Sequence, residues 1–216
     1  MHVRVISSVL LLFLLGTRVS LGIADDSSTL EALLAPISSL KGNFEQILLN
    51  ERGVELQHLS GTLALKKPGQ FRWEVRGDEP RIVISDGKKV WDYDQDLEQV
   101  TIQRLNQGQS KAPIFFLTGA KNELHKDFSV KKLPLVKGKC LQKSDTCFEL
   151  ISKGEEGAFL WIKIGFKNKH LQEMELLDQL GQRSVFRFNH IDLNPALSKT
   201  TFQFVPPPGI DILEGD

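Results

Sequence analysis

The stretch that decides the fold is Leu65 to Ile102, LKKPGQFRWEVRGDEPRIVISDGKKVWDYDQDLEQVTI. From residue 71 to 75 apolar side chains alternate with charged ones, which predicts a strand with one apolar and one charged face. Pro68-Gly69 and Asp86-Gly87 separate the apolar runs at positions suited to hairpin turns. Trp91 and Tyr93 repeat the period of two. An aromatic sheet face without a nucleophile or a metal cluster indicates a surface that holds an apolar ligand and does not cut bonds.

The same alternation and turn signals continue along the chain, and they predict an antiparallel meander. The expected strands are 44–50, 54–66, 70–76, 81–85, 89–93, 99–104, 128–134, 148–153, 159–166, 171–177, 183–191 and 201–204. Gly61 marks a candidate bulge in the second of them. The economical arrangement is one large, strongly curved sheet with about eleven or twelve strands and short helices over its concave face.

Two segments interrupt the strand pattern with helical signals. The first helix is expected at 30–37, with Ser28 or Thr29 as its cap and Pro36 disturbing its last turn. The second is expected at 113–118, opened by proline and closed by glycine, and another helical turn at 121–125. The second helix holds four consecutive large apolar residues, which is compatible with core filling. Because all four cannot face one core, some should meet a second apolar surface or a ligand.

The N-terminus has the pattern of a secretory signal peptide. An apolar run at 3–15 has His2 and Arg4 near its start, and small residues precede a candidate cleavage point between Ala24 and Asp25. The alternative is a retained membrane anchor, but the run is much shorter than the roughly 20 residues that span a bilayer. We therefore expect residues 1–24 to be removed and residues 25–216 to form one exported domain.

The charge of the expected domain is nearly balanced. Without Arg4 and Arg18, 25 basic side chains remain against 27 acidic ones. This near-balance argues against a nucleic-acid partner, so none is expected. The expected cleavage region contains no cysteine, so we do not expect the chain itself to be lipidated.

The two cysteines, Cys140 and Cys147, have six residues between them. In an exported protein this predicts a disulfide at the base of a polar hairpin. A redox pair and half of a zinc site are the alternatives. Neither a Cys-x-x-Cys spacing nor a nearby histidine supports them.

Sequence motifs of catalysis and cofactor binding do not occur in the chain. The sequence has no G-x-S-x-G, H-E-x-x-H, P-loop or G-x-G-x-x-G. Asp92, Asp94 and Asp96 begin like a calcium loop, but Leu97 and Gln103 replace the glycine and the bidentate glutamate that the loop needs. We therefore expect no catalytic residues, no metal and no cofactor, and a binding protein in place of an enzyme.

Five segments carry a resemblance to a known family. They are 65–73, the D-G-x-x-V-W-x-Y-D run within 85–101, Phe44-x-Gln46, Ala112-Pro113, and the ending Phe202-x-Phe204-x-Pro206-Pro207-x-Gly209. Together they resemble the LolA family of periplasmic outer-membrane lipoprotein carriers, over essentially the whole chain after residue 24.

The resemblance implies an incomplete, unclosed antiparallel β-barrel with a helical lid over its concave face. It also implies a soluble, monomeric periplasmic carrier without a cofactor. Such a carrier takes lipoproteins from an inner-membrane ABC transporter, shields their acyl chains and passes them to an outer-membrane receptor. A periplasmic lipid or glycolipid carrier of the same fold is the alternative.

By position, the resemblance implies which residues bind acyl chains and hold the lid. The expected lining and lid residues are Leu30, Leu34, Ile37, Leu40, Phe71, Trp73, Trp91, Ile114, Phe115, Phe116 and Leu117. The family often places arginine before the proline of the segment that holds the lid, where this chain has Lys67. Lysine keeps the charge but loses the bidentate fork. We therefore expect a weaker latch at Lys67, or one made by Arg72.

Overall fold

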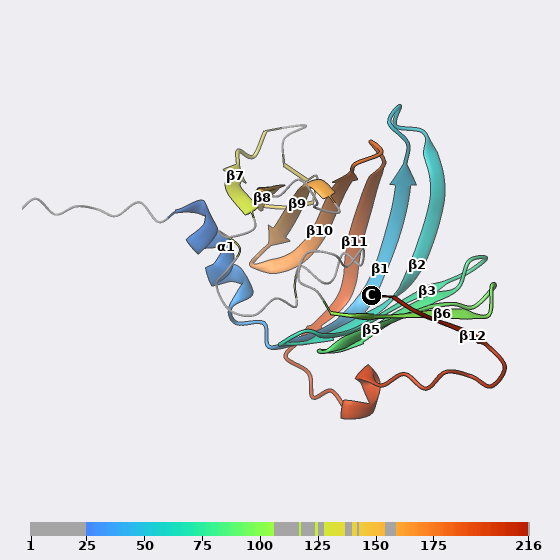
Figure 1. The fold of residues 1–216 in the computed structure, drawn as a ribbon. Helices are drawn as coiled ribbons and strands as arrows, with labels where there is room; N and C mark the ends of the chain where they lie inside the picture. The colour runs from blue at the N-terminus through green and yellow to red at the C-terminus, as the bar shows by residue number, and fades with distance from the viewer. Residues whose placement is uncertain are drawn as a thin grey trace, which may run out of the picture.

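Twelve strands form one strongly curved sheet in this computed structural model (Figure 1). The structure describes residues 25–105, 117, 124, 128–136, 140–141, 143–153 and 159–215. The strand order is β12-β6-β5-β4-β3-β2-β1-β11-β10-β9-β8-β7, with β12 and β7 at its two ends. All neighbours pair antiparallel except β12, which runs parallel to β6. The expected unclosed β-barrel is thereby confirmed.

The strands follow the predicted meander, mostly to within one or two residues. They are β1 (Ser39–Leu49), β2 (Glu55–Lys66), β3 (Gln70–Arg76), β4 (Arg81–Asp86), β5 (Lys89–Asp94), β6 (Gln99–Arg104), β7 (Phe128–Leu133), β8 (Thr146–Ser152), β9 (Phe159–Lys167), β10 (His170–Asp178), β11 (Arg183–Leu193) and β12 (Asp211–Glu214). β1 begins five residues earlier than expected, because Ser39 to Asn43 pair with the end of β2. β1 lies at the centre of the sheet, between β2 and β11.

Gly61 is required by packing and does not mark a bulge. Its Cα faces the Phe44 ring, and a Cβ there would lie 2.5 Å from Phe44 Cζ and against the Glu74 carbonyl. The β1–β2 register runs without a shift past this point and changes only between Leu48 and Leu49. The absent side chain therefore lets the Phe44 ring lie flat on β2.

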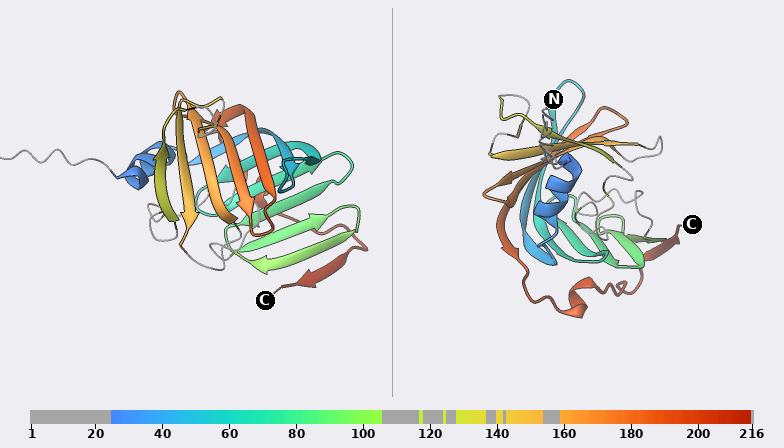
Figure 2. Two further views of the ribbon diagram at one scale, coloured as in Figure 1. Left: turned by 90° about the horizontal axis from the view of Figure 1, so that it is seen from above. Right: turned by 90° about the vertical axis from the view of Figure 1, so that its left-hand side faces the viewer.

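The helix α1 (Asp26–Leu34) lies in front of the curved sheet when the molecule is viewed from that side (Figure 2, right). It begins four residues before the predicted start because the Asp25 carbonyl accepts the first helical bond, from the Thr29 N–H at 3.0 Å. It ends at Leu34, three residues before the expected end, because Pro36 has no N–H with which to continue the helical hydrogen bonds. Leu30 and Leu34 are buried.

The C-terminal segment covers the convex face of β3 and β4. The predicted strand at 201–204 is wrong, since Lys199–Phe202 is a 3-10 helix, η1, whose first turn is capped by the Ser198 hydroxyl. η1 contacts β3 and β4. Phe202 is 1% exposed, and the rings of Phe204 and Tyr93 lie 5.6 Å apart. The chain then runs along the outside of the sheet to β12 (Figure 1).

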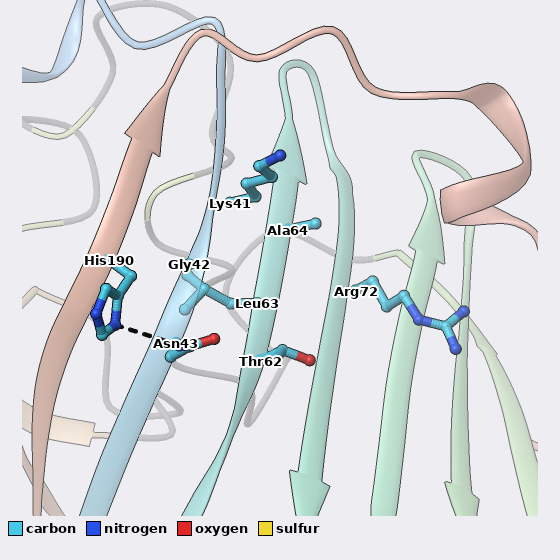
Figure 3. Close-up of a pocket in the computed structure, with 8 residues that line it drawn as sticks. All are labelled: Lys41, Gly42, Asn43, Thr62, Leu63, Ala64, Arg72 and His190. Carbon is cyan, nitrogen blue, oxygen red and sulfur yellow. Dashed lines mark hydrogen bonds between the residues drawn. The ribbon is translucent and has the colours of Figure 1, made fainter.

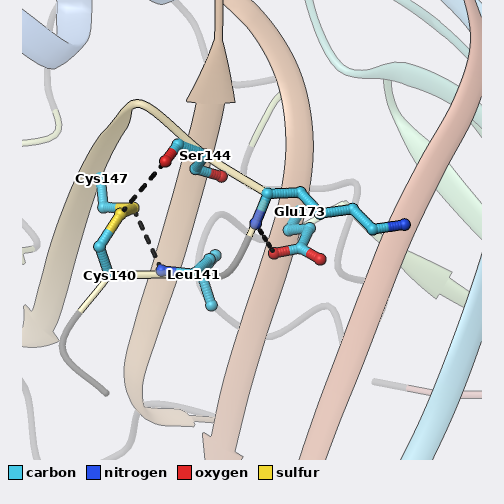
Figure 4. The surroundings of a disulfide bond; sticks show 6 residues. Cys140, Leu141, Ser144, Cys147 and Glu173 are labelled. Carbon is cyan, nitrogen blue, oxygen red and sulfur yellow. Dashed lines mark hydrogen bonds between the residues drawn. A yellow bond between two sulfur atoms is a disulfide. The ribbon is translucent and has the colours of Figure 1, made fainter. Parts of the chain in front are cut away.

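A disulfide holds a second cover on the convex face of the other half of the sheet (Figure 4). Cys140 pairs with Cys147 of β8, which confirms the predicted bond. The enclosed segment lies over Gly165, where a Cβ would meet Ser144 and Leu141. Glu173, 3% exposed, accepts the Lys143 N–H at 3.4 Å and pairs with Arg187. The staple therefore closes this face over a buried carboxylate.

Three expectations fall mainly on residues outside the described part of the chain: the signal peptide at 1–24, the helix at 113–118 and the turn at 121–125. Leu117 and Leu124 are described, and both are helical. In the described ranges, no helix has the length and apolar character needed to cross a membrane.

Candidate functional site: the concave face and its covering helix

Most of the expected lining residues come together in one buried cluster on the concave side of the sheet. Those described in this cluster are Leu30, Leu34, Ile37, Leu40, Phe71, Trp73 and Leu117. None of them is more than 8% exposed. Residues 114–116 lie outside the described ranges, so their place in the lid stays a prediction. The apolar side chains of α1 thus occupy the face where an apolar ligand would lie.

Aromatic rings form the middle of this face. Trp73 of β3 stacks on Phe44 of β1, with ring centroids 3.7 Å apart. Phe186 of β11 meets Trp73 edge-on at 5.6 Å. The strand registers bring these rings together, because Leu63 of β2 pairs with Trp73 of β3 and Gly61 of β2 pairs with Phe44 of β1. Sequence reasoning missed Phe44 and Phe186 as parts of this face, although Phe44 belongs to a segment that carried the resemblance.

Trp91 lies on the opposite side of the sheet. It pairs with Ile84, which pairs with Arg72, and paired residues point to the same face. Arg72 alternates with Phe71 and so points away from the concave cluster. Trp91 therefore belongs to the convex face, and we leave it out of the proposed acyl-chain site.

Lys67, at the end of β2, holds the C-terminal end of α1. Its Nζ donates to the Leu34 carbonyl at 2.9 Å, and its backbone N–H donates to the Ser38 carbonyl at 2.9 Å. Desolvation by burial lowers the pKa of Lys67 from its ordinary value. The last carbonyls of a helix lack partners within the helix and favour a cation. Lys67 is therefore placed to act as the expected latch.

Arg72 has no part in this latch, because it lies on the convex face with its guanidinium on Glu74. Figure 3 shows it at the rim of a groove of about 300 Å³. The groove is lined by Lys41, Gly42, Asn43, Thr62, Leu63, Ala64, Arg72 and His190. The groove and the aromatic cluster are on opposite faces, so we do not assign acyl chains to the groove.

Asn194, just after β11, holds the linker between α1 and β1, and sequence reasoning missed it. Its Oδ1 accepts the Ser38 N–H at 2.8 Å and the Ser38 hydroxyl at 2.9 Å. Its Nδ2 donates to the Pro36 carbonyl at 3.0 Å. The backbone adopts φ +57°, which asparagine tolerates better than most residues. The Asn-Pro pair at 194–195 is a turn signal that could have identified this position.

The arrangement favours reversible binding of apolar groups. A helix whose apolar residues cover an aromatic face can be displaced by a ligand that buries the same area. Within the described ranges, no group of three or more His, Cys, Asp and Glu side chains is placed to hold a metal ion. The geometry thus defines a class of protein, an open β-sheet carrier with a helical cover.

Comparison with known proteins places the chain within this class. Residues 35–205 match the family described as "Outer membrane lipoprotein carrier protein LolA". The protein therefore belongs to the LolA family.

Curated relatives agree with this assignment, and a solved structure shares the fold. An outer-membrane lipoprotein carrier protein of Dechloromonas aromatica is 35% identical over 175 residues, 81% of either chain. One of Pseudomonas aeruginosa is 34% identical over 203 residues, 93% of this chain and 94% of the relative. An uncharacterized conserved protein of Thermus thermophilus, only 9% identical, shares the fold with a TM-score of 0.51, covering 87% of this chain and 99% of its own.

Proposed function

We propose that this protein is a lipoprotein carrier that holds acyl chains on the concave face of its sheet after α1 has moved aside. The observation that supports this most is the shared burial of α1 with Trp73 and Phe71 in one apolar cluster. A helix that belongs permanently to the core would need no polar contact at its edge. Here the last turn of α1 is held by a hydrogen bond from the partly buried Lys67. The relatives are named as outer-membrane lipoprotein carrier proteins, so lipoproteins are the proposed cargo.

The proposal requires that cargo and cover compete for the same surface. Burying an acyl chain contributes about 0.8 kcal/mol per CH₂. Exposing Leu30, Leu34 and Ile37 costs about 1.5–3 kcal/mol for each side chain. A chain of about 15 CH₂ groups therefore exceeds the cost of opening by about 3–8 kcal/mol, a margin that leaves binding reversible. Reversibility is what a carrier needs, because it must release its cargo.

The wider pathway is part of the same proposal. Residues 1–24 act as a cleaved signal peptide, and residues 25–216 work as a single-domain monomer in the periplasm. The donor is an inner-membrane lipoprotein-releasing ABC transporter, and the acceptor is an outer-membrane receptor. We expect no bond of the cargo to be made or broken, since the buried cluster of the concave face is apolar and the relatives are named as carriers.

The test is release of a labelled lipoprotein from inner-membrane vesicles that contain the transporter. We expect the label to appear in a soluble complex with this protein, in amounts that depend on ATP. A protein that leaves lipoproteins on the membrane but extracts free phospholipid would instead be a lipid carrier of the same fold. A soluble product without its acyl chains would show an acyl hydrolase and contradict the proposal.

A further inference from the structure

The two ends of α1 are attached to strands that lie far apart in the sheet. The C-terminal end is tied to the β2 side, where Lys67 and the linker to β1 hold it. The N-terminal end lies against β7, the last strand at the other end of the sheet. There the Asp26 Oδ2 accepts the backbone N–H of Lys132 at 2.8 Å. The helix therefore runs from the middle of the sheet to its β7 edge.

The partner of Asp26 is a backbone group of an edge strand. β7 pairs with β8 on one side only, and the Lys132 N–H that binds Asp26 belongs to the unpaired side. Without Asp26 this donor would face solvent. The bond is charge-assisted but solvent-exposed, so it stabilises the closed position modestly and breaks readily.

The covalent connections decide which end of α1 can travel. The C-terminal end continues through a short linker into β1, and Asn194 holds that linker at Ser38 and Pro36. The N-terminal end has β7 as its described contact outside the helix. A movement that uncovers the concave face therefore pivots at the linker and separates Asp26 from Lys132.

We propose that Asp26 is a positioning residue, which latches the moving end of α1 to β7 and thereby sets how readily acyl chains enter. This inference rests on the proposed function. The apparent affinity for cargo is proportional to the fraction of molecules in the open state. Loss of the Asp26 bond should therefore strengthen acyl binding, the opposite of what loss of a lining residue would do.

The variant that tests this is Asp26→Ala, titrated with a synthetic dipalmitoylated cysteine peptide. We expect its apparent affinity to rise about three- to tenfold over the wild type, as the loss of one charge-assisted hydrogen bond predicts. Asp26→Asn keeps an oxygen acceptor and should stay closer to the wild type. Asp25→Ala is the matched control, because the Asp25 side chain makes no capping bond to the described helix.

Amide hydrogen exchange distinguishes a residue that latches α1 from one that only stabilises the fold. In the cargo-free wild type the Lys132 amide should be protected, and loading with the peptide should speed its exchange. In cargo-free Asp26→Ala the amides of Leu30 and Leu34 should also exchange faster, while Ile164 in β9 stays protected.

Two results would overturn the inference. One is Asp26→Ala with the same peptide affinity as Asp25→Ala, and the other is a Lys132 amide that stays protected when the peptide is bound. Failure of the proposed function looks different, since the wild type would then not bind the peptide at all. In that case the cargo-free exchange of α1 in Asp26→Ala still decides whether the latch exists.

Discussion

Lys67 connects the helix α1 to the strands through a single side-chain hydrogen bond, to the Leu34 carbonyl. Its burial lowers its pKa, which shows that the charged form is partly desolvated in this position. The desolvation opposes the gain from the bond, so the latch is weaker than the bond alone suggests. A weak latch suits a cover that must open during each transfer.

We predict that Lys67→Leu increases the apparent affinity for a dipalmitoylated peptide about fivefold, because about 1 kcal/mol of closed-state stabilisation is lost. The same variant should pass the peptide more slowly to acceptor liposomes. Lys66→Leu, at the exposed neighbouring position, is the control for loss of charge. Unchanged affinity in Lys67→Leu would show that the lysine does not hold the helix.

Strand alternation predicted least well which face of the sheet each side chain of the site would lie on. Alternation shows that Phe71 and Trp73 share a face, and that Trp91 and Tyr93 share one. It does not relate the two strands, because their relation depends on the hairpin registers between them. The observed registers place Val90 opposite Ser85, so Trp91 falls on the convex face. Arg72 was excluded as a latch for the same reason.

The linker between α1 and β1 is the element on which we propose that the cover turns. Asn194 satisfies groups on both sides of it, the Pro36 carbonyl and the N–H and hydroxyl of Ser38. Ser39 adds a bond from its hydroxyl to the Pro195 carbonyl at 2.8 Å. The linker is therefore fixed to the end of β11, a strand far away in sequence.

We predict that Asn194→Ala lowers the free energy of unfolding by about 2–3 kcal/mol, since several hydrogen bonds are lost and alanine is strained at positive φ. Asn194→Gly loses the same bonds without the strain and should be about 1 kcal/mol more stable than the alanine variant. Urea denaturation measures both values. If the alanine variant is as stable as the wild type, Asn194 does not hold the linker. If the glycine variant is less stable than the alanine variant, the positive φ of Asn194 is not a source of strain for alanine.

Whole elements were predicted well where hairpins repeat and poorly where contacts are distant. β3 to β6 follow the period of two closely because short turns join antiparallel neighbours. The end of the chain differs, since Phe202 and Phe204 alternate like a strand but lie in and after a 3-10 helix. The four residues of β12 are all exposed, so no apolar alternation marked that strand.

The open sheet gives the whole molecule two apolar faces with different covers. On the convex face, η1 and the disulfide-stapled segment cover the strands, and Ile84, Val100 and Phe202 are buried there apart from the main cluster. On the concave face the described cover is α1 with Leu117, held by polar bonds near its edges. We propose that acyl chains bind only to the concave face.

The three tryptophans of the chain allow this claim to be tested directly. Trp73 lies on the concave face, whereas the strand registers place Trp91 and Trp161 on the convex face. Three single-tryptophan proteins, with the other two tryptophans changed to phenylalanine, would be titrated with a lipopeptide that carries bromine on its acyl chains. We predict strong quenching of Trp73 fluorescence and none of Trp91 or Trp161. Quenching of Trp91 equal to that of Trp73 would contradict the account.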